Sequence, residues 1–127
     1  MIEIKLPFKT PTINHLYWHR GNIKIMKTEA KKLREEIREI VQSDTCGLHD
    51  ISDSKLKVRV EIHENWFCKN GSIKRKDVAN REKFLIDSVF AALGIDDKFI
   101  FEHNIVKIQN KDSEFSVIKI EALENGN

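Results

Sequence analysis

Short stretches in which apolar and polar residues alternate predict β-strands at the start and in the middle of the chain. Residues 2–6 alternate, and Pro7 follows them as a turn residue that ends the strand. Residues 57–63 alternate strictly, which places His63 on the outer face of the second predicted strand. The residues expected on its core face are Val58, Val60 and Ile62.

The last third of the chain contains two further strand-like stretches, residues 99–108 and 114–122. A polar turn, residues 110–113, separates them. Because a short turn most simply joins neighbouring antiparallel strands, we predict that these two strands pair with each other as a closing hairpin.

Two longer stretches carry apolar residues at helical spacing. Residues 27–43 predict an amphipathic helix with a solvated charged face, ending near Gly47. Residues 78–93 predict a second helix, with Asp77 as its N-cap and Gly94 as its C-terminal stop. The apolar side of this second helix consists of Phe84, Leu85, Ile86, Val89 and Ala92.

The predicted order of elements is therefore β-α-β-α-β-β, without an internal repeat. This order predicts an α+β, or mixed α/β, fold in which two helices pack on a small sheet. At 127 residues the length fits a single domain, residues 1–127, and leaves no room for a second core.

Composition narrows the functional classes. The hydrophobic fraction of 40% and charged fraction of 33%, with a mean hydropathy of −0.45, indicate a soluble protein. No apolar run is long enough for a membrane span, and no secretory signal is recognisable, so we expect a cytoplasmic protein with no membrane partner. Cys46 and Cys68 lie far apart, which argues against a zinc site or a disulfide. The net charge of +2 is too small to indicate a nucleic-acid partner by itself.

Polar residues gather in and around the second predicted helix. One face of this helix carries Asn80, Lys83 and Asp87, at positions i, i+3 and i+7. Asp77 precedes the helix and Asp97 follows it, so that the two are roughly 25 Å apart if the helix is straight. Asp77 and Asp97 can share one site only if the next strand runs back along the helix or if a second subunit supplies one of them.

These residue types suit metal-dependent cleavage of a phosphodiester bond. Mg²⁺ held by one or two carboxylates activates a water and stabilises the charge on the phosphate. Lys83 can stabilise the developing negative charge or protonate the leaving oxygen. Each residue also has an ordinary structural explanation: Asp77 as a helix cap, Asp97 in a turn, and Lys83 paired with Asp87. The residues alone leave both interpretations open.

As a whole, this part of the chain resembles the RusA family of Holliday junction resolvases. The resemblance consists of a basic run leading into Asp-x-x-Asn-x-x-Lys, an Asp four residues after the Lys, and Gly-x-Asp-Asp. These motifs are present as Asp77, Asn80, Lys83, Asp87, Gly94, Asp96 and Asp97. Upstream, weaker similarity to the family's opening strand and proline-rich loop is carried by Leu6, Pro7, Pro11, Asn14 and Tyr17. Nearly the whole chain is covered, and residues 74–97 are the most specific.

The resemblance implies a RusA-like fold and an endodeoxyribonuclease that resolves four-way DNA junctions in recombination and repair. It implies that Asp77 and Asp97 are metal-binding catalytic carboxylates and that Lys83 is the catalytic lysine. It also implies Mg²⁺, with Mn²⁺ as a substitute, and a homodimer. One position departs from the family's Asp-x-Asp-Asn: this chain has Ala79, whose methyl group cannot bind a metal.

Ala79 has three possible explanations. In a natural subgroup, Asp87 or Asp96 would complete the metal site. In a degenerate member, the chain would bind branched DNA without cutting it. In an engineered variant, the site would have been inactivated. We favour the first because Lys83 and the other acidic residues remain. A small interaction protein with no nucleic-acid role is the competing function of a different class.

Basic residues beside the expected site are candidates for contacts with DNA phosphates. The candidates before the second helix are Lys69, Lys74, Arg75 and Lys76, in a stretch that contains the turn signal Asn70-Gly71. Asn80 is a further candidate on the helix. Asn14 and Tyr17 belong to a polar and aromatic cluster that could stack on bases near a branch point or pack its loop onto the core.

Overall fold

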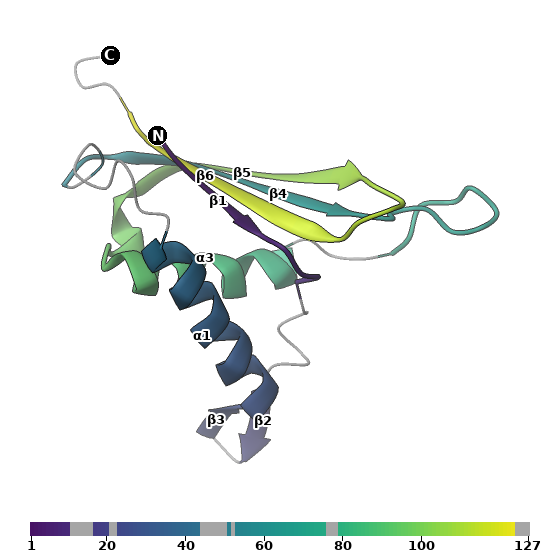
Figure 1. The fold of residues 1–127 in the computed structure, drawn as a ribbon, viewed down its shortest axis with the longest axis horizontal. Helices are drawn as coiled ribbons and strands as arrows, with labels where there is room; N and C mark the ends of the chain where they lie inside the picture. Colours follow the sequence, from purple (N-terminus) through teal and green to yellow (C-terminus); the bar gives the residue numbers. More distant parts are fainter. Residues whose placement is uncertain (11–16, 21–22, 44–50, 52, 76–78, 124–127) are drawn as a thin grey trace.

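The structure of this chain is a computed structural model. It describes the chain apart from residues 11–16, 21–22, 44–50, 52, 76–78 and 124–127, and it leaves the side chains of 17–20, 23–26 and 79–80 undescribed. A twisted sheet forms one layer, and two helices cover one face of it (Figure 1). This confirms the predicted α+β class. In the described residues, no helix is both long enough and apolar enough to pass through a membrane.

The sheet has four strands in the order β1-β6-β4-β5. Their bounds are β1 Ile2–Leu6, β6 Phe115–Ala122, β4 Leu56–Glu64 and β5 Ile100–Gln109. The helices are α1 Thr28–Ser43 and α3 Ala79–Leu93, and a 3₁₀ turn, η2, spans Asp97–Phe99. Each predicted strand and helix is therefore present within one or two residues of its expected bounds.

The predicted hairpin of the last two strands is wrong. β4 lies between β5 and β6, parallel to β5 and antiparallel to β6. The link between β5 and β6 crosses the end of β4, where the Asn110 backbone N–H donates to the Glu64 carbonyl at 2.9 Å. Alternation of apolar and polar residues identifies the face that each strand buries but not which strand lies beside it. The pattern therefore could not show that β4 lies between β5 and β6.

A second difference lies before α1, in a segment for which the sequence predicted only a loop. Two short antiparallel strands, β2 Tyr17–Arg20 and β3 Ile23–Met26, pair there in a separate sheet. Figure 1 shows this pair beyond the N-terminal end of α1 and away from the main sheet. A strand of four residues is too short for its apolar–polar alternation to be distinguished from the sequence of a polar loop.

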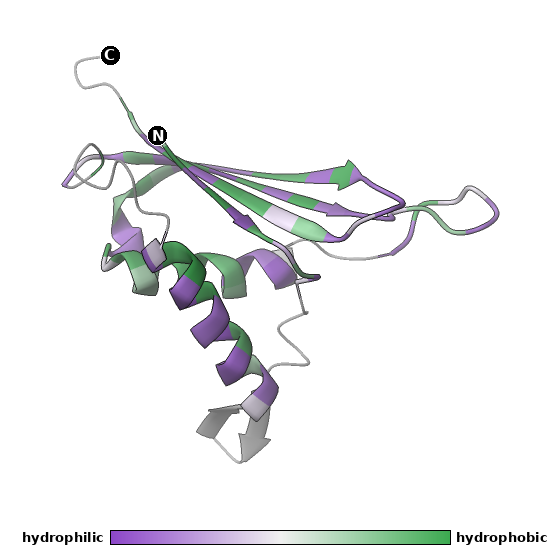
Figure 2. Cartoon of the chain, in the orientation of Figure 1, coloured by the Kyte–Doolittle hydropathy of each residue, from purple (hydrophilic) through white to green (hydrophobic). Residues whose placement is uncertain are grey.

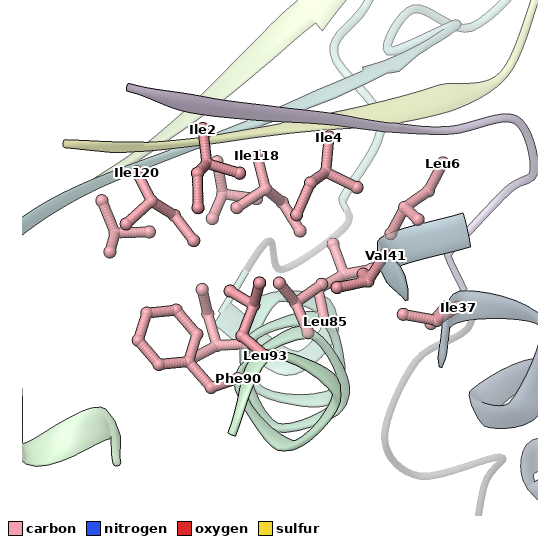
Figure 3. Close-up of a cluster of buried hydrophobic side chains, with 14 of the residues drawn as sticks. Ile2, Ile4, Leu6, Ile37, Val41, Leu85, Phe90, Leu93, Ile118 and Ile120 are labelled. Carbon is pink, nitrogen blue, oxygen red and sulfur yellow. The ribbon is translucent and has the colours of Figure 1, made fainter. Parts of the chain in front are cut away.

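The core fills the space between the sheet and the helices. Figure 3 shows side chains from β1 and β6 meeting those of α3, with Ile37 and Val41 of α1 beside Leu6. Val58, Val60 and Ile62 of β4 are buried, as their alternation predicted. Each isoleucine or leucine fully buried here contributes about 1.5–3 kcal/mol to stability.

Helix α3 is buried along most of its length. Phe84, Leu85, Val89 and Phe90 are almost inaccessible to solvent, and Figure 2 shows α3 as mostly hydrophobic, whereas α1 has a hydrophilic outer side. The helix ends at Gly94, whose φ of 72° is the left-handed conformation that glycine adopts at little cost. The Ile95 N–H donates to the Phe90 carbonyl and the Gly94 N–H to that of Ala91, which is a Schellman ending. Gly94 therefore ends α3, as the sequence predicted.

The face of the sheet opposite the helices carries charged side chains. Glu61 lies there with only 11% of its side chain exposed, beneath Arg59, His63 and Lys119. The hydrogen bond from Arg59 holds the pKa of the Glu61 carboxyl below its usual range, and His63 and Lys119 act in the same direction. His63 also stacks on Phe115, with ring centres 4.2 Å apart. His63 thus lies on the outer face, as predicted.

Candidate functional site

A pocket of about 490 Å³ lies between α3 and the start of β5. Its polar lining consists of Glu82, Lys83, Asp87, Asp97 and His103, and its apolar lining of Ile86, Ile100 and Phe101. Three of the residues singled out from the sequence, Lys83, Asp87 and Asp97, thus border one space.

The path of the chain after α3 brings these residues together. Asp97, which follows the helix, borders the pocket with Lys83 and Asp87 from the middle of the helix. Six residues later, His103 reaches Glu82, nearer the start of the helix. The segment from η2 into β5 therefore runs back along α3, so that residues from both ends of the 83–97 stretch meet within one chain.

A second pocket, of about 360 Å³, adjoins the first on the side of α1. Asp87 and Asp97 line both pockets, and Asp96 and Arg34 line only the second. Asp87 and Asp97 therefore stand at the boundary between the two spaces, where their carboxylates are accessible from either side.

Glu82 and His103 are pocket residues to which the sequence analysis gave no role. His103 Nε2 and Glu82 Oε1 are 3.0 Å apart, and the Glu82 side chain is only 14% exposed. Burial raises the pKa of the Glu82 carboxyl above its usual range; the nearby Asp87 adds to the rise, whereas His103 and Lys83 oppose it. Glu82 is hard to recognise in the sequence because its burial depends on β5, which follows almost twenty residues later.

Comparison with protein families finds a match to the model of the endodeoxyribonuclease RusA over residues 7–121. The chain belongs to the RusA family. No curated protein sequence matches it significantly. RusA proteins are endodeoxyribonucleases that resolve Holliday junctions, the branched DNA intermediates of recombination, so family membership connects this chain with that activity.

The structure describes the RusA-type motif residues unequally. Asp77 and Lys76 lie outside the described residues, as does Asn14. Ala79 and Asn80 form the start of α3, but nothing is described of their side chains. The structure therefore leaves the position of Asp77 relative to Asp97 as a prediction.

Among the described acidic motif residues, Asp96 caps a turn with its side chain. Its side chain accepts a hydrogen bond from the Lys98 backbone N–H at 2.9 Å and so caps η2. Asp97, the next residue, is exposed and borders both pockets. The cap occupies one oxygen of Asp96, which makes Asp97 the freer of the two to bind a ligand.

The carboxylates on the pocket can be compared with the ligands preferred by the divalent metal that RusA-type chemistry implies. Three carboxylates, Glu82, Asp87 and Asp97, border the first pocket, and carboxylate oxygen is the donor that Mg²⁺ prefers. Within the described part of the chain, however, no three acidic, histidine or cysteine side chains are close enough to hold a metal ion together. The donors fit a hard cation in chemistry, and a closed site requires a further ligand such as Asp77.

A buried ion pair holds the start of α3 against the end of β4. The Arg81 guanidinium donates to the Glu64 carboxylate at 2.6 Å, and the two side chains are 3% and 2% exposed. Arg81 and Lys107 both lie over the ring of Trp66, at 5.5 and 4.9 Å from its centre. Arg81 thus fixes the turn of helix that precedes Lys83, a role that its place among other charged residues in the sequence did not reveal.

The predicted basic stretch forms an arm that projects from the end of β4 (Figure 1). Phe67 and Ile73 bridge its two sides, and Gly71 turns it with a φ of 85°. Lys69 and Lys74 line a groove of about 810 Å³ along the arm, together with Lys111 of the neighbouring turn. Arg75, the last described residue of the arm, is exposed. None of the described residues that line this groove is acidic.

Proposed function

We propose that this chain is a divalent-metal-dependent endodeoxyribonuclease that cuts four-way DNA junctions in the cytoplasm as a homodimer. The observation that carries the proposal is the return of β5 along α3, which places Lys83, Asp87 and Asp97 around one pocket. In a RusA-family chain, a lysine and two carboxylates at this place match the needs of phosphodiester hydrolysis.

Asp97 and Asp77 are the residues that would hold Mg²⁺ or Mn²⁺, and Asp87 and Asp96 are candidates for a further ligand. When bound, such a cation activates a water and stabilises the charge on the phosphate. Lys83 places a positive ammonium group on the same pocket, where it can stabilise the developing charge or donate a proton to the leaving oxygen.

The projecting arm is the proposed contact with DNA. Lys69, Lys74 and Arg75 lie on it, and the lysines among the described residues of the groove suit a phosphate backbone. Lys76, Asn80, Asn14 and Tyr17 remain proposed contacts as well. Because a junction must be cut in two strands, a two-fold symmetric pair of chains would supply two equivalent sites.

One observation supports a second function. Ala79 removes a carboxylate that the RusA motif carries, so a protein that binds junctions without cutting them is the alternative. A junction complex that forms in EDTA and remains uncut after Mg²⁺ is added distinguishes this alternative from a nuclease.

The direct test uses a synthetic four-way junction and the matching linear duplex. We expect the junction, and not the duplex, to be nicked in two opposed strands when Mg²⁺ or Mn²⁺ is present, and to remain whole in EDTA. Sedimentation of the junction complex is expected to give two protein chains per junction. Cleavage that is equal with and without metal, or absent at every metal concentration, would rule out the proposed nuclease.

The arm has its own prediction. Replacing both Lys74 and Arg75 with alanine is expected to weaken junction binding and to reduce the slope of log K against log[salt] by about 2, since each lost phosphate contact removes about one. Gel shifts at several salt concentrations measure this slope. A matched double variant on the exposed side of α1, Lys32→Ala with Arg38→Ala, is expected to keep the parent slope. Equal slopes for the two double variants would contradict the assignment.

A further inference from the structure

Ala79 leaves the RusA-type site one carboxylate short, and three described acidic residues are near enough in the sequence to replace it. Asp96 caps η2 through its side chain. Asp87 is eight residues from Ala79, or about 12 Å along the helix axis. Glu82 is three residues from Ala79, or about 4.5 Å along the axis. Of the two residues on the helix, Glu82 is much closer to residue 79 along the axis, and Asp96 already serves as a cap.

Helix geometry directs Glu82 toward that position. Residues three apart lie on the same helix face, and side chains on a helix lean toward its N-terminus. The Glu82 side chain therefore leans back over the turn that contains residue 79. Because a glutamate side chain is long, its carboxylate can reach a space that the short alanine side chain at 79 leaves empty. The same side chain borders the pocket that Lys83 and Asp97 line.

The described surroundings of Glu82 contain little fixed positive charge for a largely buried carboxylate. Its side chain is 14% exposed, and His103, which contacts it at 3.0 Å, is charged only when protonated. Among the described residues, the other charged groups on the pocket are Lys83 and the acidic Asp87 and Asp97, so the described carboxylates outnumber the described fixed cations. Burying a carboxylate costs free energy unless a positive group compensates it. A divalent cation between Glu82 and Asp97 would provide that compensation.

We propose that Glu82 supplies the carboxylate that Ala79 cannot, and that His103 positions it toward a metal bound by Asp97 on the same pocket. This inference rests on the proposed function, since it completes the same site. It identifies the chain as a RusA-family variant in which the second acidic ligand has moved one helical turn along α3. Asp87 then remains at the boundary of the two pockets rather than in the place of residue 79.

The test compares Glu82→Gln, the double variant Ala79→Asp with Glu82→Gln, and the parent. Mn²⁺ binding to the protein alone is measured by electron paramagnetic resonance, and junction cleavage is measured separately. We expect Glu82→Gln to lose at least about tenfold in Mn²⁺ affinity, with a larger loss in cleavage rate, and the double variant to recover both. Glu102→Gln is the matched control, because Glu102 faces Lys57 rather than the pocket.

Several outcomes overturn the inference. Parent-like Mn²⁺ affinity in Glu82→Gln would do so, as would a double variant that fails to regain affinity while its thermal unfolding matches the parent. Ala79→Asp alone gives a test that does not depend on the folding of Glu82→Gln: if Glu82 already serves, cleavage changes little, whereas a large gain shows that the site was incomplete. A parent that binds Mn²⁺ through Glu82 but cuts no junction would refute the proposed function and leave the metal site standing.

Discussion

Replacing Asp97 with asparagine is expected to abolish junction cleavage and to leave the fold unchanged. Asp97 is exposed at the start of η2 and borders both pockets, so its carboxylate is free to bind a cation and does not support the core. Loss of a charged ligand should lower the cleavage rate by roughly 10²–10³-fold or more, the scale seen when one group that stabilises transition-state charge is removed. Stability should stay within about 0.5 kcal/mol, as for other exposed positions.

Single-turnover cleavage of the four-way junction measures this effect, and urea unfolding checks the fold. Asp112→Asn, an exposed change in the turn after β5, is the control and is expected to cut at the parent rate. Asp96→Asn separates the two neighbouring aspartates, because asparagine can still accept the capping hydrogen bond from Lys98. If Asp96→Asn lost cleavage and Asp97→Asn kept it, the assignment of the metal ligand would have to be exchanged between them.

Most of the fold could be predicted because each element carries a local signal. The alternation at Val58, Val60 and Ile62 reflects burial of one face of β4, and Gly94 marks a helix end by a conformation that other residues avoid. The order of the strands carries no such signal. Whether β6 pairs with β5 or with β4 depends on contacts between segments about sixty residues apart, and both arrangements bury the same faces.

For the site, the sequence could indicate candidate residues but not how they come together. Residue type and spacing made Lys83, Asp87 and Asp97 candidates, but only the return of β5 along α3 shows that all three border one pocket. Glu82 and Arg81 were missed for the opposite reason. A charged residue next to Lys83 is usually solvated, and only the contacts with His103 and Glu64 show that these two side chains are turned inward.

The buried pair of Arg81 and Glu64 gives the largest expected effect on stability. Arg81→Met keeps the length of the side chain and removes its charge, so the Glu64 carboxylate, 2% exposed, loses the guanidinium that lies 2.6 Å away. Breaking a buried pair from one side typically costs about 3–5 kcal/mol. Since a domain of this kind is stable by only about 5–15 kcal/mol, urea unfolding should show a large fall in the midpoint.

The control for Arg81→Met is Arg38→Met on α1, where the ion pair with Glu35 is long, at 3.8 Å, and more than half exposed. That change should cost no more than about 1 kcal/mol. Adding Glu64→Gln to Arg81→Met should recover part of the loss, because a neutral amide is less costly to bury than a carboxylate. If Arg81→Met were as mild as Arg38→Met, the pair would not be what fixes the start of α3, and the position of Lys83 would have to depend on the apolar packing of Phe84 and Leu85 instead.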